Sequence, residues 1–531
     1  MRFVGTPSVL ETTLIVSKSF VERKRLAVTS LSTFQLISAS FSTLTAFMWS
    51  GGHHHLHVFC VPFMAQGHMI PMVDLAKLFA SHGADVSLIA MTHDSASYEK
   101  IVDQTRPFGS QIKTHLLEFP DTSKNLDSLT TNDDIVNFIS SLDEFQEPLK
   151  RLVEKHRPDC IVSDFFLPWT MEVATQFGIP RLAFTGSSFF SYCVIDSLPR
   201  HRPHDRVASD REPFVVPGLP HRIELTRSQL PDNLKKQQGS FTELWERVKE
   251  ADHRSFGAVM NSFKELERHY IEHFEKTEMG KKAWAVGPLS LCNRTTADMA
   301  ERGKRGSVSA EDCLKWLDTK MVGSVVYVCF GSMCRPSAGQ LLEIALALES
   351  ADRPFLWVVS ENTNKLLENE RLPEGLEERL KGRGLIIRGW APQVLILKHP
   401  AVGAFVSHCG WNSVLEGVTA GVAMITWPFF AEQFYNEKLI TQVLRIGVPV
   451  GSEVWVSGEN PDRPLISKER IEKAIAALMD GGDEAEGMRK RARELGEMAS
   501  RAVEVGGSSY KDMSRLINDV KMCGGEPFGK S

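Results

Sequence analysis

Short apolar segments alternate with segments of helical periodicity along most of this chain. In the first half, apolar runs of strand length end at turns, and the segments between them carry apolar residues three or four positions apart. One such helix has Pro71 near its first turn and presents Met72, Leu75, Ala76 and Phe79 on one face. The predicted strands are 57–63, 85–91, 158–164 and 180–184, and the later helices are 134–155 and 169–177.

The same alternation returns in the second half, after a polar stretch at 292–310 that we interpret as a linker. A final helix places Tyr510, Met513, Leu516 and Val520 on one face. Strands that alternate with helices are typical of parallel, doubly wound sheets, so we predict an α/β protein with two such domains. The predicted strands are 324–330, 355–359, 385–388, 404–407 and 422–426, with helices from about 336 and 411 and at 468–479 and 484–503.

Composition narrows the class of protein. The chain has 531 residues, 42% of them hydrophobic and 24% charged, with a formal net charge of −5, which gives no reason to expect nucleic acid as a partner. Its nine cysteines include no CxxC pair, as in a reduced cytoplasmic protein. No apolar run reaches the length of about 18 residues that a membrane span needs. We therefore expect a cytoplasmic monomer that does not span a membrane.

The most informative stretch is 390–433, which is rich in Trp, His, Gly and carboxamide residues. In its middle, the predicted strand 404–407 passes through a Gly turn into a helix that begins near Trp411. α/β folds present free backbone N–H groups to a phosphate at such a junction. Glu432 and Gln433 end the stretch with paired polar groups that suit sugar hydroxyls.

The side chains around this junction fit a nucleotide sugar. His408, Asn412 and Ser413 lie at the helix start, where backbone amides, side-chain donors and the helix dipole together favour a diphosphate. Glu416 follows Asn412 by one helical turn, so its carboxylate can face the same cleft and accept from a ribose diol. Trp390 offers a flat face for a base. An ordinary βαβ unit with core tryptophans is the alternative, and the conjunction of these residues disfavours it.

This stretch resembles, over its whole length, the signature of the plant secondary-product UDP-glycosyltransferases. The resemblance implies a GT-B fold, in which two Rossmann-like domains face each other, and a UDP-sugar as donor. Because a terminal Gln accompanies glucose donors in that family and a His accompanies galactose donors, Gln433 implies UDP-glucose. The resemblance assigns uracil to Trp390 and Ala391, ribose to Gln393 and Glu416, diphosphate to His408, Asn412, Ser413 and, more weakly, Ser332, and the sugar to Trp411, Glu432 and Gln433.

Two residues of the first half are candidates for the chemistry. His68 follows the first strand and Asp164 ends a later one, so both reach the edge of the sheet where doubly wound folds bind ligands. An imidazole can take the proton of a hydroxyl, and a carboxylate on its far nitrogen would fix the tautomer. The alternatives are a helix-start histidine and a helix-capping aspartate without a catalytic role. The family's catalytic His and Asp follow strands of this kind, and the resemblance implies an inverting transfer with His68 as the base.

The resemblance also implies a role for each part of the chain. Residues 1–55 are rich in Ser and Thr, and they fit either a transit peptide or an extension upstream of a true start at Met48. We favour an extension that is disordered or not native, because relatives of this enzyme class begin shortly before their first strand. The remaining parts are an acceptor-binding domain at 56–291, a linker at 292–310, a UDP-sugar-binding domain at 311–505, and at 506–531 a helix that packs back on the N-terminal domain.

We expect no metal ion and no cofactor besides UDP-glucose as co-substrate, because the chain has no Asp-x-Asp motif to chelate a metal-bound diphosphate. The local His cluster at 53–57 gives no specific metal site. Residues 524–531 fit the letters of a P-loop but lack the strand before it and the helix after it.

The function predicted is transfer of glucose to a hydroxyl of a small lipophilic plant metabolite, such as a flavonoid, another phenolic or a terpenoid. Two alternatives stay open. One is the same fold with another UDP-sugar, or with formation of a glucose ester on a carboxylic acid. The other is a non-catalytic binder of a nucleotide sugar or metabolite. The acceptor pocket is expected from loops near 119–135, 186–200 and 205–240.

Overall fold

The structure is a computed structural model that describes residues 55–92, 95–117, 131–235, 240–277, 282–303, 306–360, 375–380, 382–457 and 463–523. The predicted extension at 1–55 lies outside these ranges except for His55. The P-loop-like residues 524–531 and most of the acceptor loop predicted at 119–135 also lie outside them. The described residues from Leu56 onward belong to one unit.

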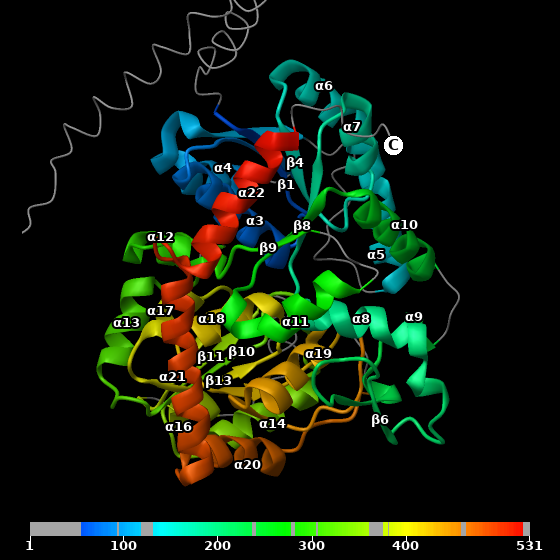
Figure 1. The fold of residues 1–531 in the computed structure, drawn as a ribbon. Coiled ribbons are helices and arrows are strands. Elements are labelled where there is room, and N and C mark those ends of the chain that lie inside the picture. Colours follow the sequence, from blue (N-terminus) through cyan, green and yellow to red (C-terminus); the bar gives the residue numbers. More distant parts are fainter. Residues whose placement is uncertain are drawn as a thin grey trace, which may run out of the picture. The chain divides into compact units, whose positions relative to one another are not determined.

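A parallel sheet forms the core of the N-terminal lobe, which is coloured blue to green in Figure 1. Its strands are β1 (His57–Val61), β2 (Asp85–Met91), β3 (Ile112–Leu117), β4 (Cys160–Asp164), β5 (Arg181–Thr185), β8 (Gly257–Met260) and β9 (Ala283–Ala285). They lie in the order β3-β2-β1-β4-β5-β8-β9. Strands β1 and β4 are short, apolar and almost wholly buried, as strands covered on both faces are. The register sets Val61 beside Ser163, so the chain leaves both strands at the same edge of the sheet.

Helices cover this sheet, and two of them differ from the prediction. The single helix predicted at 134–155 is two helices joined by a 3-10 turn at Leu142–Phe145. Pro148 lies in the first turn of the second helix, where its missing N–H costs no helical bond. The helices are α3 (Gln66–Ser81), α4 (Ser95–Thr105), α5 (Asn132–Ser141), α6 (Gln146–His156), α7 (Thr170–Phe177), α8 (Phe189–His201), α9 (Asp232–Lys235), α10 (Ser240–Arg254) and α11 (Lys264–Lys276), with a hairpin of β6 (Pro213–Val215) and β7 (Glu224–Thr226).

Helix α3 is the second difference, because it begins at Gln66 and Pro71 therefore lies inside it. Proline has no N–H group and cannot bond to the carbonyl four residues before it, which here is that of Gly67. The first turn of α3 thus has a free carbonyl next to His68.

A second parallel sheet forms the C-terminal lobe, in the order β12-β11-β10-β13-β14-β15. Its strands are β10 (Val325–Cys329), β11 (Phe355–Val359), β12 (Gly384–Arg388), β13 (Val402–Ser407), β14 (Met424–Thr426) and β15 (Gly447–Pro449). The helices of this half are α12 (Thr296–Glu301), α13 (Ala310–Asp318), α14 (Ala338–Ser350), α16 (Leu376–Leu380), α17 (Gln393–Lys398), α18 (Trp411–Thr419), α19 (Gln433–Lys438), α20 (Lys468–Met479) and α21 (Asp483–Val503). The prediction of an α/β protein with two parallel sheets is confirmed.

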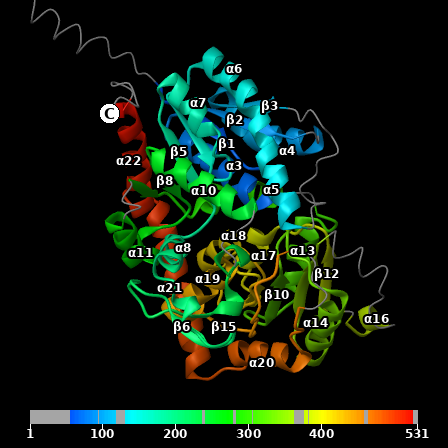
Figure 2. The ribbon, with the colours of Figure 1, turned by 90° about the vertical axis from the view of Figure 1, so that its right-hand side faces the viewer.

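The last helix, α22 (Ser508–Cys523), leaves the C-terminal half and packs against β9 of the first sheet, as Figures 1 and 2 show. Its apolar face joins the core of the N-terminal lobe through Met513, Leu516 and Val520. Asp519 accepts a hydrogen bond from the indole nitrogen of Trp284 at 3.2 Å. None of the helices that the structure describes is long and apolar enough to span a bilayer.

We expect Met513→Ala to lower the free energy of unfolding by about 2–5 kcal/mol, because Met513 is 0% exposed and its loss leaves a cavity in the core. Denaturant unfolding followed by circular dichroism measures the change. Met522→Ala is the matched control on the same helix, and because Met522 is 80% exposed its effect should stay below about 0.5 kcal/mol. Equal losses in the two variants would contradict the docking of α22.

Candidate active site

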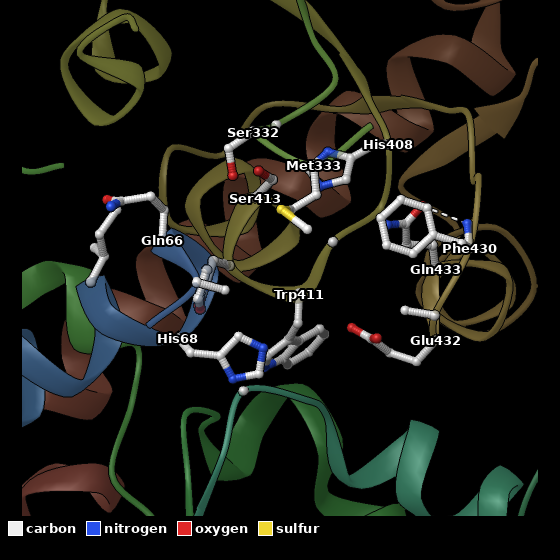
Figure 3. Close-up of a pocket in the computed structure, with 18 of the residues that line it drawn as sticks. Gln66, His68, Ser332, Met333, His408, Trp411, Ser413, Phe430, Glu432 and Gln433 are labelled. Carbon is white, nitrogen blue, oxygen red and sulfur yellow. Dashed lines mark hydrogen bonds between the residues drawn. The ribbon is translucent and has the colours of Figure 1, made fainter. Parts of the chain in front are cut away.

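A cavity of about 770 Å³ lies between the carboxyl-terminal edges of the two sheets and is lined by residues of both lobes (Figure 3). His68 lines it from the N-terminal lobe, and Asp164 lies behind His68 and is fully buried. The structure therefore brings the predicted donor-site residues to one cavity with the predicted base. The predicted donor-site residues that line it are Ser332, Trp390, Ala391, Gln393, His408, Trp411, Asn412, Ser413, Glu416, Glu432 and Gln433.

The ends of β1 and β4 bring His68 and Asp164 together. The Nδ1 atom of His68 lies 2.7 Å from Oδ2 of Asp164. The other carboxylate oxygen, Oδ1, accepts a hydrogen bond from the backbone N–H of Phe166 at 3.0 Å. Because the carboxylate accepts, Nδ1 carries the proton of the neutral ring, and Nε2 of that form keeps a lone pair. His68 is 21% exposed, so the ring reaches the cavity while its partner does not.

Aromatic rings enclose His68 and make its environment poor in water. Phe63, Phe165 and Phe166 have ring centroids within 5.3–5.9 Å of the imidazole. This burial by itself lowers the pKa of His68. The charge of Asp164 and its hydrogen bond act in the opposite direction, with a further contribution from Glu432, and together they raise the pKa above its ordinary value.

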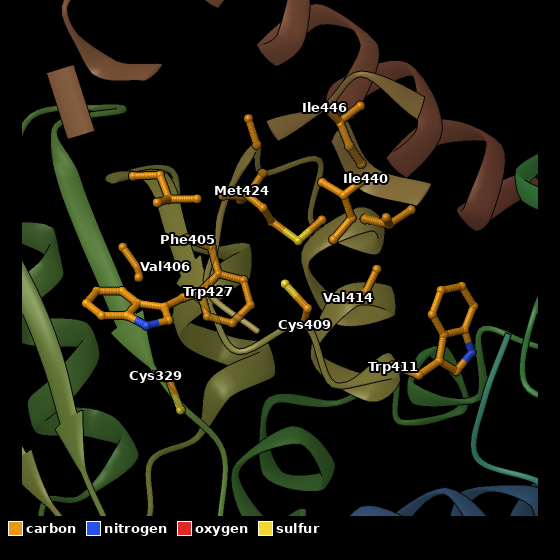
Figure 4. Close-up of a cluster of buried hydrophobic side chains, with 14 of the residues drawn as sticks. Cys329, Phe405, Val406, Cys409, Trp411, Val414, Met424, Trp427, Ile440 and Ile446 are labelled. Carbon is orange, nitrogen blue, oxygen red and sulfur yellow. The ribbon is translucent and has the colours of Figure 1, made fainter. Parts of the chain in front are cut away.

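The turn from β13 into α18 is built into a rigid apolar core, which Figure 4 shows around Cys409. Cys409 has a φ of 64°, an uncommon conformation for a residue other than glycine. Asn436 holds this residue by donating from its side-chain amide to the Cys409 carbonyl at 2.9 Å. The turn brings the start of α18, from Gly410 to Ser413, to the cavity wall, and the free amides of a helix start can meet an anion there.

His408 lies on the cavity wall before this turn, between two glycines. A Cβ atom on Gly331 or Gly410 would overlap its imidazole ring, so glycine is needed at both positions. Burial lowers the pKa of His408 to about 4, against a smaller raising effect of the Cys329 backbone, so the ring is neutral at pH 7. Its Nδ1 atom is buried without a hydrogen-bond partner. A diphosphate placed beside this ring would favour its charged form.

Gln393, Ser413 and Glu416 form one hydrogen-bonded group. The side-chain amide of Gln393 donates to Ser413 Oγ at 3.0 Å and to Glu416 Oε2 at 2.7 Å. Its carbonyl oxygen accepts from the hydroxyl of Tyr327 at 3.1 Å. These bonds fix the orientation of the Gln393 carboxamide. Through its bond to Oε2, Gln393 also fixes the orientation of the Glu416 carboxylate in the cavity wall.

Two predicted donor-site residues also join the lobes. The indole N–H of Trp411 donates to the carbonyl of Asn261 at 2.7 Å, so this group is not free for a sugar. The side-chain amide of Asn412 donates at 2.5 Å to the carbonyl of Gly67. That carbonyl is the one that Pro71 leaves without a helical partner, so the proline inside α3 creates the acceptor for Asn412.

Glu432 and Gln433 begin helix α19 and face the cavity (Figure 3). The side-chain oxygen of Gln433, Oε1, accepts hydrogen bonds from the backbone N–H groups of Phe429 at 2.8 Å and Phe430 at 3.1 Å. Its side-chain amide nitrogen lies beside the Cys334 thiol, which leaves one N–H for a ligand. Burial raises the pKa of Glu432, and the neighbouring His68 acts against this shift.

Sequence analysis missed Arg302, which follows α12 in the predicted linker. Its guanidinium donates to Asp74 of α3 at 2.8 Å and also to Glu416 of α18. Burial lowers the pKa of Arg302, but the charges of the two carboxylates outweigh it and raise the pKa above its usual range. No motif marks this arginine, because it is one of several charged residues in a polar segment.

Among the residues that the structure describes, no group of three or more His, Cys, Asp or Glu side chains is placed to hold a metal ion. The groups that face the cavity around the start of α18 are instead donors of hydrogen bonds and backbone amides. Such groups can hold an anion directly.

Comparison with known proteins identifies the family of this chain. The family model described as "UDP-glucoronosyl and UDP-glucosyl transferase" matches residues 303–449. Scopoletin glucosyltransferase of Nicotiana tabacum is 48% identical over 474 residues, which cover 88% of this chain and 98% of that protein. Anthocyanin 3'-O-beta-glucosyltransferase of Gentiana triflora is 46% identical over 476 residues, covering 88% of this chain and 98% of the relative. The chain belongs to this family of UDP-glycosyltransferases.

Solved structures of plant UDP-glycosyltransferases share the fold of this one. Glycyrrhiza uralensis UGT73P12, complexed with glycyrrhetinic acid 3-O-monoglucuronide, matches with a TM-score of 0.81 and 41% identity, covering 88% of this chain and 96% of that chain. Medicago truncatula UGT71G1, complexed with UDP-glucose, matches with a TM-score of 0.71 and 28% identity, covering 89% and 99%. The GT-B fold expected from the resemblance is confirmed for this glycosyltransferase.

We expect Asp164→Asn to lower the pKa of His68. The substitution removes the carboxylate charge that raises this pKa, while the burial that lowers it remains. A lower pH is then needed to protonate the ring, which NMR of the ¹³C-labelled imidazole measures, with His68→Gln to assign the signal. Glu432→Gln is the matched comparison and should give a smaller decrease, because its contribution is the weakest of those that raise the pKa. An unchanged pKa in Asp164→Asn would contradict the pairing.

Proposed function

We propose that this glycosyltransferase transfers glucose from UDP-glucose to a hydroxyl of a small lipophilic plant metabolite, such as a flavonoid, another phenolic or a terpenoid, with inversion at the anomeric carbon. The observation that carries the proposal is the pair of His68 and Asp164 at the wall of the cavity that the 390–433 residues line. A protein that only bound a nucleotide sugar would have no use for an oriented base there.

His68 is the general base in this proposal. Because Asp164 holds the proton on Nδ1, the lone pair of Nε2 is available to the hydroxyl of the acceptor. The acceptor gives its proton to Nε2 while its oxygen bonds to the anomeric carbon. The bond from that carbon to the β-phosphate oxygen breaks in the same step, and UDP leaves with the electron pair. Attack and departure on opposite faces invert the configuration, and Asp164 stabilises the imidazolium that forms.

The diphosphate of the donor is assigned to the start of α18. His408 supplies an imidazole at the cavity wall, and Ser332 and Ser413 supply hydroxyls. Asn412 keeps its second amide hydrogen, because only one is used on Gly67. These donors and the helix dipole meet the negative charge of the leaving group, so the proposal includes no metal ion and no further cofactor.

The nucleoside and the sugar are assigned to the remaining residues of the stretch. Uracil would stack on Trp390 and bond to the backbone of Ala391, and the ribose would lie beside Gln393 and bond to Glu416. The glucose would contact Glu432, Gln433 and the ring of Trp411, whose N–H is already used on Asn261. The carboxamide of Gln433 supports this assignment, because the bonds to its oxygen fix its orientation and leave an N–H donor for a sugar hydroxyl.

The acceptor is assigned to the part of the cavity next to His68. Apolar side chains dominate there, and they suit a flat lipophilic alcohol better than a charged one. Relatives that act on scopoletin and anthocyanin support a phenolic acceptor. The apolar residues that line this part are Phe63, Ile135, Ile139, Phe166 and Phe241.

The proposal also includes the predictions on alternative reactions, cellular location, oligomeric state and domain boundaries. Formation of a glucose ester and use of another sugar are alternatives within the same fold, and a non-catalytic binder is disfavoured by the oriented base. Nine free cysteines support the expected cytoplasmic location. The monomeric state and the domain boundaries remain predictions.

We expect His68→Ala to lower kcat for scopoletin glucosylation by about 10²–10⁴-fold, because the hydroxyl loses its base. The affinity for UDP should change less than about threefold, since the proposal gives His68 no contact with the nucleotide. UDP release measures the first quantity and calorimetry the second. His82→Ala, at the other end of α3, is the control and should keep wild-type turnover. Equal turnover of His68→Ala and wild type would contradict the assignment of His68 as the base. If the wild type binds UDP but turns over none of the phenolics tested, the alternative of a non-catalytic binder is favoured.

We expect Gln433→His to raise the ratio of kcat/KM for UDP-galactose over UDP-glucose by about tenfold. The imidazole cannot accept hydrogen bonds from both Phe429 and Phe430. The N–H group that contacts the sugar therefore takes a different position in the variant. Initial rates with the two donors give the ratio. Gln442→His, outside the cavity, is the control for the substitution itself. If the ratio stays the same in both variants, Gln433 does not select the sugar.

A further inference from the structure

Arg302 connects the two lobes through a single guanidinium. Its Nε donates to Asp74 on α3 at 2.8 Å, and one of its terminal nitrogens donates to Oε1 of Glu416 on α18. The arginine side chain is 10% exposed, and those of Asp74 and Glu416 are 2% and 6% exposed. A buried cation between two buried carboxylates is strongly held, because removing it would leave both charges without their main partner.

The hydrogen bonds around Glu416 leave each of its carboxylate oxygens able to accept one further hydrogen bond from a ligand. Oε1 accepts from Arg302 and Oε2 accepts from Gln393 at 2.7 Å, so each oxygen has one protein donor. A carboxylate oxygen can accept two hydrogen bonds. One lone pair on each oxygen therefore remains, which matches the two adjacent hydroxyls of a ribose. Asp74 has an independent partner, because Asn293 donates to its Oδ1 at 2.8 Å.

The main chain of the same residue contacts the predicted platform for uracil. The indole N–H of Trp390 donates to the carbonyl of Arg302 at 3.3 Å. Gly303 follows with a φ of 86°, and a Cβ atom there would overlap the indole ring. One residue thus holds both groups assigned to the nucleoside, the ring of Trp390 through its backbone and the carboxylate of Glu416 through its side chain.

We propose that Arg302 is a positioning residue for the nucleoside of the donor, which orients Glu416 to accept both ribose hydroxyls and ties that carboxylate to the helix that carries His68. The inference rests on the proposed function, because it takes Glu416 as the ribose acceptor. Asp74 and His68 lie on the same helix, α3, so the bridge fixes the ribose acceptor relative to the base. The proposal gives Arg302 no contact with the acceptor or with the anomeric carbon.

The test compares two ligands that differ only in the ribose hydroxyls. Calorimetry measures the affinity of wild type and Arg302→Met for UDP and for 2′,3′-dideoxy-UDP. We expect Arg302→Met to lower the affinity for UDP by about tenfold or more, since the hydrogen bonds of an oriented carboxylate are lost. The affinity for the dideoxy ligand should fall less than about threefold. Arg353→Met, which removes an arginine paired with Asp480, is the control and should change neither affinity.

Each other outcome has a separate meaning. If wild type binds both ligands equally, the assignment of ribose to Glu416 fails, and the proposed function is revised at that point. If wild type prefers UDP but Arg302→Met loses both ligands equally, Arg302 only holds the lobes together and the inference is overturned. Tighter binding of UDP by the variant would also overturn it, because Arg302 would then compete with the ribose.

A second variant covers a failure of Arg302→Met to fold. Arg302→Lys keeps the charge but offers a single point of contact, so it cannot serve Asp74 and Glu416 in the same way. We expect it to fold and to lose part of its preference for UDP over the dideoxy ligand. Full wild-type preference in Arg302→Lys would show that charge alone suffices and would contradict a positioning role.

Discussion

The buried carboxylate of Asp164 sets the main constraint on this site. A carboxylate with no exposure to water needs hydrogen bonds to remain in place, and the fold provides them from His68 and from the backbone of Phe166. The Phe166 N–H is local to the turn after β4, but the imidazole of His68 is available only because β1 and β4 are neighbours and end level with each other. The topology of the first sheet therefore creates the pair, and the aromatic residues around it make their interaction strong.

Contacts between α3 and α18 also fix the position of His68 relative to the residues proposed to bind the UDP-sugar. Asn412 bonds to the carbonyl that Pro71 leaves free beside His68, and Arg302 joins Glu416 to Asp74 further along the same two helices. Two links at different points along a helix fix its rotation as well as its position. The reactive carbon of a donor held by α18 would then lie at a set distance from an imidazole held by α3, as in-line displacement requires.

Much of this could be predicted from the sequence, because it depends on local patterns. The alternation of strands and helices indicated two parallel sheets, and the 390–433 stretch indicated residues that all line one cavity. Strands β3, β8, β9 and β15 were not identified. Three of them are only three or four residues long, too short for a period to show, and β3 carries polar residues at the sheet edge.

The contacts of Arg302 could not be predicted, because they join segments far apart in sequence and follow no spacing rule. The same holds for Asn261 and Trp411. The sequence shows Pro71 but not that α3 begins at Gln66, so it does not reveal the carbonyl that the proline frees. Local periodicity locates an element, but it does not show which carbonyl or carboxylate of another element will meet it.

The two sides of the cavity differ in how far sequence can specify their ligands, and the reason is physical. The donor side uses directional hydrogen bonds from fixed groups, such as the carboxamides of Gln393 and Gln433, whose partners are set by backbone and side-chain neighbours. Such groups must be of one residue type, so their ligand can be inferred from their identity. The proposed acceptor side is lined by apolar side chains, among them those of Phe63, Ile135 and Phe241. Many combinations of apolar side chains give similar contact energy, and only their shape separates one lipophilic alcohol from another. Changes confined to these apolar residues can therefore alter the acceptor without altering the residues that are proposed to hold the nucleotide sugar.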